Sequence, residues 1–217
     1  MQDFILVTGI IIKQMPIGES DRRVTILTNS RGKISAFARG ARKPNSRFSG
    51  TTCPFCFGNF KLYEGRDAYN IAEADIKNYF EEFRTDLDGS FYAAYFAEIA
   101  DYYCRENNDE REMMKLFYQS LRALCAPSLN DRLVRYIYEL KSIAVNGEYP
   151  GPPENMTLSE SALYTLDFIA KSPIESLYSF KVADSVLDEL GNVAGLYRKR
   201  YMEHSFRSLD ILEGLSG

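Results

Sequence analysis

The sequence has no apolar run that approaches the roughly 20 residues a membrane-spanning helix needs. Its opening, MQDFILVTGIIIK, carries Asp3 where a secretory signal peptide has Lys or Arg. The four cysteines make a poor disulfide framework for 217 residues, because Cys53 and Cys56 form one close pair while Cys104 and Cys125 stand apart. These absences predict a cytoplasmic protein with reduced thiols and no membrane contact.

Motifs for nucleotide chemistry and for catalysis are also missing. No G-x-x-x-x-G-K-[ST] loop or G-x-G-x-x-G turn is present, so the chain lacks the glycine-rich cradle that binds phosphates in such enzymes. The single histidine, His204, lies beside Glu203 and Arg207, and the sequence shows no triad pattern around it. A histidine near a helix end commonly complements the helix dipole. We therefore expect no catalytic residue, no cofactor and no small-molecule substrate.

Positive charge is concentrated in the first third of a chain whose net charge is −4. Residues 1–75 hold 11 basic and 7 acidic side chains, a net charge of +4, whereas residues 76–217 hold 15 and 23, a net charge of −8. The window 22–63 contains nine basic side chains and no acid, and such a set repels itself unless a polyanion neutralises it. The nine are Arg22, Arg23, Arg31, Lys33, Arg39, Arg42, Lys43, Arg47 and Lys61.

The first 80 residues show the β-branched composition and the turn residues of short strands. Five such strands in about 80 residues, joined by Gly-bearing turns, predict a small closed barrel such as the OB-fold. The expected strands cover residues 4–13, 23–28, 33–39, 59–63 and 69–74.

After Tyr79 the pattern changes to helical spacing, which predicts an α+β protein: an OB-fold barrel in residues 1–80 and an all-α domain in residues 81–217. Thr157–Glu160 and Ser172–Glu175 both have capping-box spacing, which predicts helix starts. The other expected helices cover residues 85 or 88 to 106, 109–126, 130 or 131 to 146, and 182–202.

The strand predicted over residues 33–39 carries an aromatic ring among cations. Successive side chains on a strand point to opposite sides, so one set faces the barrel interior and the other faces outward. A ring between two outward cations suits a nucleic-acid strand, because a base stacks on the ring and phosphates pair with the charges. The alternative is a solvated basic face with Phe37 in the core. The outward set is Lys33, Ser35, Phe37 and Arg39, and the inward set is Ile34, Ala36 and Ala38.

The segment after this strand extends the basic surface. Gly40 turns freely and Pro44 favours an extended Lys43, so we expect a mobile, projecting loop. No helix-turn-helix, zinc finger or basic zipper is visible for reading duplex DNA. We therefore predict a site for single-stranded or partly opened DNA or RNA, bound largely without sequence preference. Its residues are Arg22, Arg23, Arg31, Lys33, Phe37, Arg39, Arg42, Lys43 and Arg47.

Several motifs together resemble the RecO family of bacterial DNA repair proteins. The resemblance covers both ends of the chain, and the G-A-R-K-P block at 40–44 is its most specific part. It implies an OB-fold followed by a helical domain, and a recombination mediator in place of an enzyme. The motifs are GIIIK at 9–13, GESD at 18–21, GKISAFARGARKPNSRF at 32–48, FKLYEGR at 60–66, AEA at 72–74 and SFRSLDIL at 205–212.

The resemblance also implies partners. Members of the family bind single- and double-stranded DNA, anneal complementary strands and, with RecR, help RecA displace the single-strand binding protein SSB, whose C-terminal tail they bind. A nucleoid-associated protein is expected on this basis. The family's DNA-contacting positions would correspond to Lys33, Arg39, Arg42, Lys43 and Arg47.

The sequence departs from the family at its zinc module. Many RecO proteins carry four zinc-binding cysteines in the helical domain, whereas residues 146–161 contain none. A structural zinc site needs four nitrogen or sulfur ligands, and the pair Cys53 and Cys56 has no second pair. We expect no metal, and the loop GEYPGPPENM at 147–156 stands where the module would be.

Two further basic patches lie in the predicted helices, each with two interpretations. Arg132, Arg135 and Tyr136 form either a site for the acidic SSB tail or a solvated helix face. Arg198, Lys199 and Arg200 form either a second DNA or partner contact or the favourable charge of a helix C-terminus. For the chain as a whole, the alternative to a DNA-binding mediator is a non-catalytic scaffold whose basic face binds an acidic partner with little direct DNA contact.

Overall fold

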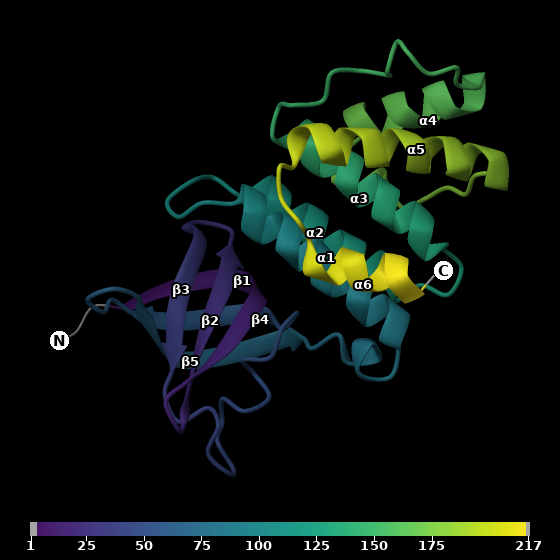
Figure 1. The fold of residues 1–217 in the computed structure, drawn as a ribbon. Coiled ribbons are helices and arrows are strands. Elements are labelled where there is room, and N and C mark those ends of the chain that lie inside the picture. The colour runs from purple at the N-terminus through teal and green to yellow at the C-terminus, as the bar shows by residue number, and fades with distance from the viewer. Residues whose placement is uncertain (1–3, 216–217) are drawn as a thin grey trace. The chain divides into compact units, whose positions relative to one another are not determined.

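The computed structural model describes residues 4–215 and has an N-terminal five-stranded barrel followed by six α-helices (Figure 1). The strands close into a barrel in the order β1, β2, β3, β5, β4, which confirms the predicted OB-fold with helices after it. Every strand reaches beyond its predicted bounds at one end or both, except that β3 ends one residue early. They are β1 (Phe4–Ile17), β2 (Asp21–Thr28), β3 (Gly32–Ala38), β4 (Phe57–Tyr63) and β5 (Tyr69–Asn78).

The barrel interior is filled by the inward residues of all five strands. Their side chains alternate with outward ones, as the period of a strand requires, and the inward ones are almost fully buried. The barrel closes where β3 runs parallel to β5, with Ala36 opposite Tyr69 and Phe37 opposite Asn70. Members of the buried cluster include Val24, Ile26, Ile34, Ala36, Ala38, Phe60 and Leu62.

The segment from Arg39 to Cys56, between β3 and β4, contains turns and no helix or strand. Ala41, Phe48 and Cys56 from this segment are buried in the same cluster as the barrel core. Its apolar side chains therefore cover one opening of the barrel, while its charged residues stay exposed.

The helical part begins after the short 3₁₀ helix η1 (Glu81–Arg84). α3 is its most buried helix, with contacts to α4 and α5, and ten of its fifteen residues are buried. The side chain of Asn130 accepts a bond from the Arg132 backbone N–H and caps this helix, as one of the two predicted starts requires. The helices are α1 (Leu87–Tyr103), α2 (Arg111–Leu124), α3 (Asp131–Val145), α4 (Glu160–Lys171), α5 (Asp184–Tyr201) and α6 (Arg207–Leu215).

Both predicted capping boxes are wrong. α4 is capped by Ser159, whose hydroxyl accepts from the Ala162 backbone N–H, so Thr157 lies outside the helix. The second box forms only the 3₁₀ helix η2 (Ile174–Ser176), which follows Pro173 without a side-chain cap. α6 was not predicted as a helix from its sequence.

By internal packing the chain divides into two compact units. One consists of Met1–Thr85 with Ala100–Met114, and the other of Asp86–Ile99 with Lys115–Gly217. The end of α1 and the start of α2 therefore belong to the unit that contains the barrel. None of the described helices combines the length and the apolar character that crossing a bilayer requires.

Candidate nucleic-acid interface

The outward side of β2 and β3 carries Phe37 between two guanidinium groups. The predicted alternation is confirmed, because Ile34, Ala36 and Ala38 are buried while the intervening side chains are partly exposed. Arg23 lies directly opposite Phe37 in the β2–β3 ladder, and its guanidinium carbon is 5.8 Å from the ring centroid. The guanidinium carbon of Arg39 is 5.7 Å from the same centroid. Phe37 is therefore not a fully buried core residue, and its partly exposed ring lies within cation–π range of two positive charges.

Arg23 and Arg39 are each held in place by a neighbour. The Nε of Arg23 donates to the Ser35 hydroxyl at 2.7 Å, on the same outward face. Arg39 pairs with Asp21 at 3.2 Å, and the other carboxylate oxygen of Asp21 accepts from the Gly40 backbone N–H at 2.7 Å. Asp21 thus fixes both Arg39 and the turn that follows β3. The sequence pointed to the two arginines, but the orienting roles of Ser35 and Asp21 depend on strand pairing.

The turn between β4 and β5 forms a further wall beside Phe37. A cavity of about 340 Å³ lies between this turn and the outward side of β2 and β3. Arg66 was missed as a candidate, although it lies in the Gly-Arg-Asp turn that separates two predicted strands. The cavity is lined by Arg23, Phe37, Arg39, Gly65, Arg66, Asp67, Ala68 and Asn70.

The segment between β3 and β4 is attached to the barrel, in contrast to the predicted freely projecting loop. The backbone N–H of Arg42 donates to the Ser20 carbonyl, and its guanidinium donates to the Gly18 carbonyl. Arg47 donates to the Ala72 carbonyl at 2.8 Å and lies 4.7 Å from the Phe48 ring centroid. These contacts keep both residues at the end of the barrel where Phe37 lies, with Lys43 exposed between them.

Arg22 points away from this surface. It pairs with Ala38 in the ladder, so it shares the inward side of the sheet. Its guanidinium donates to the Ser49 carbonyl at 3.1 Å and to the Thr52 hydroxyl at 2.8 Å. Arg22 therefore binds the segment between β3 and β4 to the barrel.

Arg31 and Lys33 lie at the other end of β3. The ammonium of Lys33 donates to the backbone carbonyl of Asp101 at 2.5 Å and to its carboxylate at 2.8 Å, and only 20% of its side chain is exposed. The Arg31 carbonyl accepts from the Asn107 backbone N–H. Four residues of extended strand, roughly 13 Å, separate Lys33 from Phe37. The predicted set is thus divided between the two ends of the strand.

We use the name cation face for the residues that the structure gathers at the Phe37 end of the barrel. Compared with the predicted set, it lacks Arg22, Arg31 and Lys33 and gains Arg66. Its members are Arg23, Phe37, Arg39, Arg42, Lys43, Arg47 and Arg66.

Most of the predicted patch on α3 is buried. Tyr136 is buried, and the side chain of Arg135 is only 12% exposed, since it pairs with Glu139 at 2.9 Å and with Glu213 at 3.0 Å. Arg132 is exposed and donates to Asp188 at 3.1 Å. Of the three residues, only Arg132 presents its charge to solvent.

The predicted patch on α5 occupies the last turn of that helix, where positive charge complements the helix dipole. Arg198 is mostly buried, with its guanidinium 3.5 Å from the carboxylate of Glu213 and 3.9 Å from that of Glu139. Lys199 and Arg200 are exposed. The fully buried Glu139, which also accepts from the Tyr95 hydroxyl at 2.6 Å, was not identified from the sequence.

None of the four cysteines is paired in a disulfide. Burial, followed by the proximity of Cys53, raises the pKa of Cys56 to about 11, so this thiol is protonated at neutral pH. Among residues 4–215, no three histidine, cysteine, aspartate or glutamate side chains gather where they could hold a metal ion.

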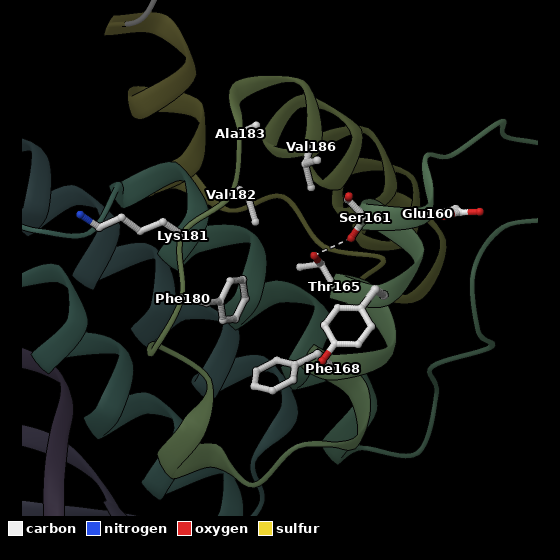
Figure 2. A pocket seen from close by; sticks show the side chains of 10 residues that line it. Glu160, Ser161, Thr165, Phe168, Phe180, Lys181, Val182, Ala183 and Val186 are labelled. Atoms are coloured by element: carbon white, nitrogen blue, oxygen red, sulfur yellow. Dashed lines mark hydrogen bonds between the residues drawn. The ribbon is translucent and has the colours of Figure 1, made fainter.

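A second cavity, of about 580 Å³, lies in the helical unit beside α4 and the start of α5. Figure 2 shows the rings of Phe168 and Phe180 close together, with the side chain of Lys181 extending away from them. The ring centroids are 5.3 Å apart in an edge-to-face arrangement. With Lys181 and Glu160 as its only charged lining residues, this cavity lacks the paired cations of the barrel site.

Comparison with known proteins gives matches over both parts of the chain. Residues 1–80 match the family model described as Recombination protein O N terminal, and residues 84–151 match Recombination protein O C terminal. The DNA repair protein RecO of Acetivibrio thermocellus is 30% identical, with 98% of each chain covered. That of Clostridium acetobutylicum is 26% identical over 94% of this chain and 95% of the relative. That of Desulforamulus reducens is 34% identical over 65% of this chain and 55% of the relative.

Proposed function

The chain belongs to the RecO family of DNA repair proteins, and we propose that its cation face binds single-stranded DNA. Membership gives the chain a role in DNA repair and recombination. The proposal concerns how the barrel takes part in that role. In the OB-fold, strands 2 and 3 together with the turns between strands 1 and 2 and between strands 4 and 5 commonly bind oligonucleotides.

The observation that carries the proposal is the partly exposed ring of Phe37 flanked by Arg23 and Arg39. The ring is partly exposed on an otherwise polar β-face, and every base offers a face on which such a ring can stack. A guanidinium group beside the ring can pair with a phosphate that flanks the stacked base. Stacking on a ring requires no particular base, which favours binding without sequence preference.

Not all cations near this end of the barrel are equally available. Arg42 and Arg47 are held by neutral carbonyl oxygens, which orient their guanidinium groups but leave the positive charge uncompensated. Arg39 is paired with the carboxylate of Asp21, so a phosphate would have to compete with that carboxylate to bind Arg39. We therefore assign phosphate binding first to Arg23, Arg42, Lys43 and Arg47, and orientation of the ring to Arg39.

Further functions are proposed from the family resemblance. We propose that the chain also binds double-stranded DNA, anneals complementary strands and, with RecR, assists the loading of RecA on DNA coated with SSB. The exposed Arg132 is the member of the predicted SSB-tail patch that remains accessible. The exposed Lys199 and Arg200 are candidates for a second basic contact. No catalytic step is part of this proposal.

The experiment is a titration of fluorescent single-stranded oligonucleotide with the full chain over a range of salt concentrations. Each phosphate that the protein neutralises contributes about 0.7 to the slope of log K against log salt. We expect a slope of roughly −3, from the four cations assigned to phosphate, and the double variant Arg42→Ala with Lys43→Ala should make it shallower by about 1.4.

The matched control replaces two other exposed cations of the same unit, Lys77 and Arg84, by Ala. It makes the same change in net charge, and we expect the slope to change by far less. An unchanged slope in the double variant, or an equal change in the control, would show that the site is misassigned. If no DNA binds at any salt concentration, the cation face instead serves an acidic protein partner.

A further inference from the structure

We propose that the cavity beside Phe37 receives a single unstacked nucleobase, so that the cation face distinguishes an unpaired strand from a duplex. The inference rests on the proposed function and goes beyond it by naming what enters the cavity. Its volume of about 340 Å³ lies at the lower end of the range for small-ligand pockets, which suits one base better than a stack of bases.

The wall opposite Phe37 is fixed by a close backbone approach. A Cβ atom on Gly65 would lie 2.3 Å from the Ala68 carbonyl oxygen and 2.9 Å from the Asn70 side-chain nitrogen. The turn can therefore fold directly over Asn70 only because residue 65 has no side chain. Asn70 in turn lies opposite Phe37 in the parallel β3–β5 pairing, so the turn and the ring belong to one rigid corner of the barrel.

The lining has the chemistry that a nucleobase needs. The ring of Phe37 offers a stacking surface, and the guanidinium planes of Arg23 and Arg39 can stack or bind phosphate. The edge of a base carries both donors and acceptors, and the polar side chains of Asp67 and Asn70 line the same cavity. Their presence separates this cavity from a purely cationic groove, which would bind any polyanion.

A paired base cannot use such a cavity. In a duplex the base faces are stacked and their pairing edges are occupied, so entry requires a base to leave the helix at a cost of a few kcal/mol. Duplex DNA would then engage only the cations of the face. Single strands would gain the base contact as well as the phosphate contacts.

The test compares an oligonucleotide with an abasic strand that has the same number of phosphates, using the wild-type full chain. A stacked base is worth a factor of roughly 5 to 150 in affinity, so we expect the abasic strand to bind more weakly by that factor with the same salt slope. Equal affinities would overturn the cavity assignment while leaving DNA binding intact. Binding of neither strand would overturn the proposed function, and this inference with it.

Two variants connect the effect to the cavity. In Phe37→Leu the affinity ratio between the two strands should fall toward one without a change in salt slope. Gly65→Ala should reduce the ratio by displacing the turn, while Lys77→Ala, whose side chain does not line the cavity, should keep it. A ratio that persists in both cavity variants would refute the proposal. The wild-type comparison decides the question even if a variant fails to fold.

Discussion

Replacing Glu139 by Gln should destabilise the helical unit far more than the loss of an exposed ion pair. The Glu139 side chain has no solvent exposure and accepts from the Tyr95 hydroxyl at 2.6 Å and from Arg135 at 2.9 Å. Burial, followed by the charge of Glu139, raises the pKa of Tyr95, so its hydroxyl remains a donor. Gln keeps the size of the side chain and an acceptor for Tyr95, so the substitution removes chiefly the charge.

The magnitude follows from what Arg135 retains. Removing one partner of a buried ion pair costs about 3–5 kcal/mol, because the other charge is left desolvated. In the native protein burial lowers the pKa of Arg135, whereas Glu139, Tyr95 and Glu213 together raise it above its ordinary value. An arginine side chain keeps its proton in proteins, so Arg135 stays charged in the variant. Arg135 keeps its pair with the half-exposed side chain of Glu213 at 3.0 Å. We therefore expect a loss of unfolding free energy at the lower end of this range, about 3 kcal/mol. For a chain of this size that corresponds to a fall in Tm of about 6–12 °C.

The assay is denaturant unfolding of the full chain followed by far-ultraviolet circular dichroism, which reports the helices. The control is Asp188→Asn, which breaks the exposed pair with Arg132 and should cost no more than about 1 kcal/mol. If Glu139→Gln loses less than about 1 kcal/mol of unfolding free energy, or no more than the control, the buried pair does not stabilise the unit and the reasoning is refuted.

Two further predictions concern titrating groups. Burial, then the charges of Asp86 and Asp88, raises the pKa of Asp131, so its contribution to stability is present at low pH and is lost as the pH rises through the folded-state pKa. Asp131→Asn should therefore raise the free energy of unfolding at pH 7 and leave it unchanged at pH 3, and a gain at both values would contradict this cause. Because the pKa of Cys56 is raised to about 11, iodoacetamide at pH 8 should label Cys53 before Cys56 in the native protein, as measured by mass spectrometry. Equal labelling of the two thiols would show that Cys56 is not shielded.

The barrel could be predicted because its signals are local. The alternation of small or branched residues with polar ones over 33–38 marks one strand, and the strand period alone decides that Ile34 is buried and Phe37 is not. The glycine-bearing turns that separate the strands are equally local. The barrel closes through the parallel pairing of Ala36 with Tyr69, which joins residues more than thirty positions apart. This closure could be predicted only from the strand count that is typical of the OB-fold.

The two helix starts that capping-box spacing predicted after residue 156 could not be located from local signals in the same way. Capping-box spacing occurs at Thr157 and at Ser172. Helix α4 nevertheless begins after Ser159, because the hydroxyl of Ser159 is the one that reaches a free backbone N–H. After Ser172 the chain makes one 3₁₀ turn, with Ile174 and Leu177 buried. Tertiary burial decided the outcome at this position, whereas the local motif did not.

The composition of the candidate site could be predicted better than its arrangement. The sequence places a ring and eight cations between positions 22 and 47, but only strand register shows that Arg22 points inward while Arg23 points outward. Lys33 binds Asp101, which is 68 positions away, so no local pattern could have removed it from the set. Arg66 joined the set for the same reason, since strand pairing brings its turn beside Phe37.

The charge that remains uncompensated is what a polyanion would meet. Of the nine basic residues in the window 22–63, carboxylates lie within ion-pair distance of Lys33, Arg39 and Lys61 in the part of the chain that the structure describes. The others contact carbonyls, hydroxyls or solvent, and a neutral acceptor satisfies a donor without cancelling its charge. Lys33 is paired with Asp101 at one end of β3, whereas at the other end Arg42 and Arg47 donate to carbonyl oxygens and Lys43 is exposed, so the cations without a carboxylate partner gather at the Phe37 end. Asp21 positions Arg39 beside the ring through its bonds to Arg39 and to the Gly40 N–H, and under the proposed function the other cations of the face bind phosphate.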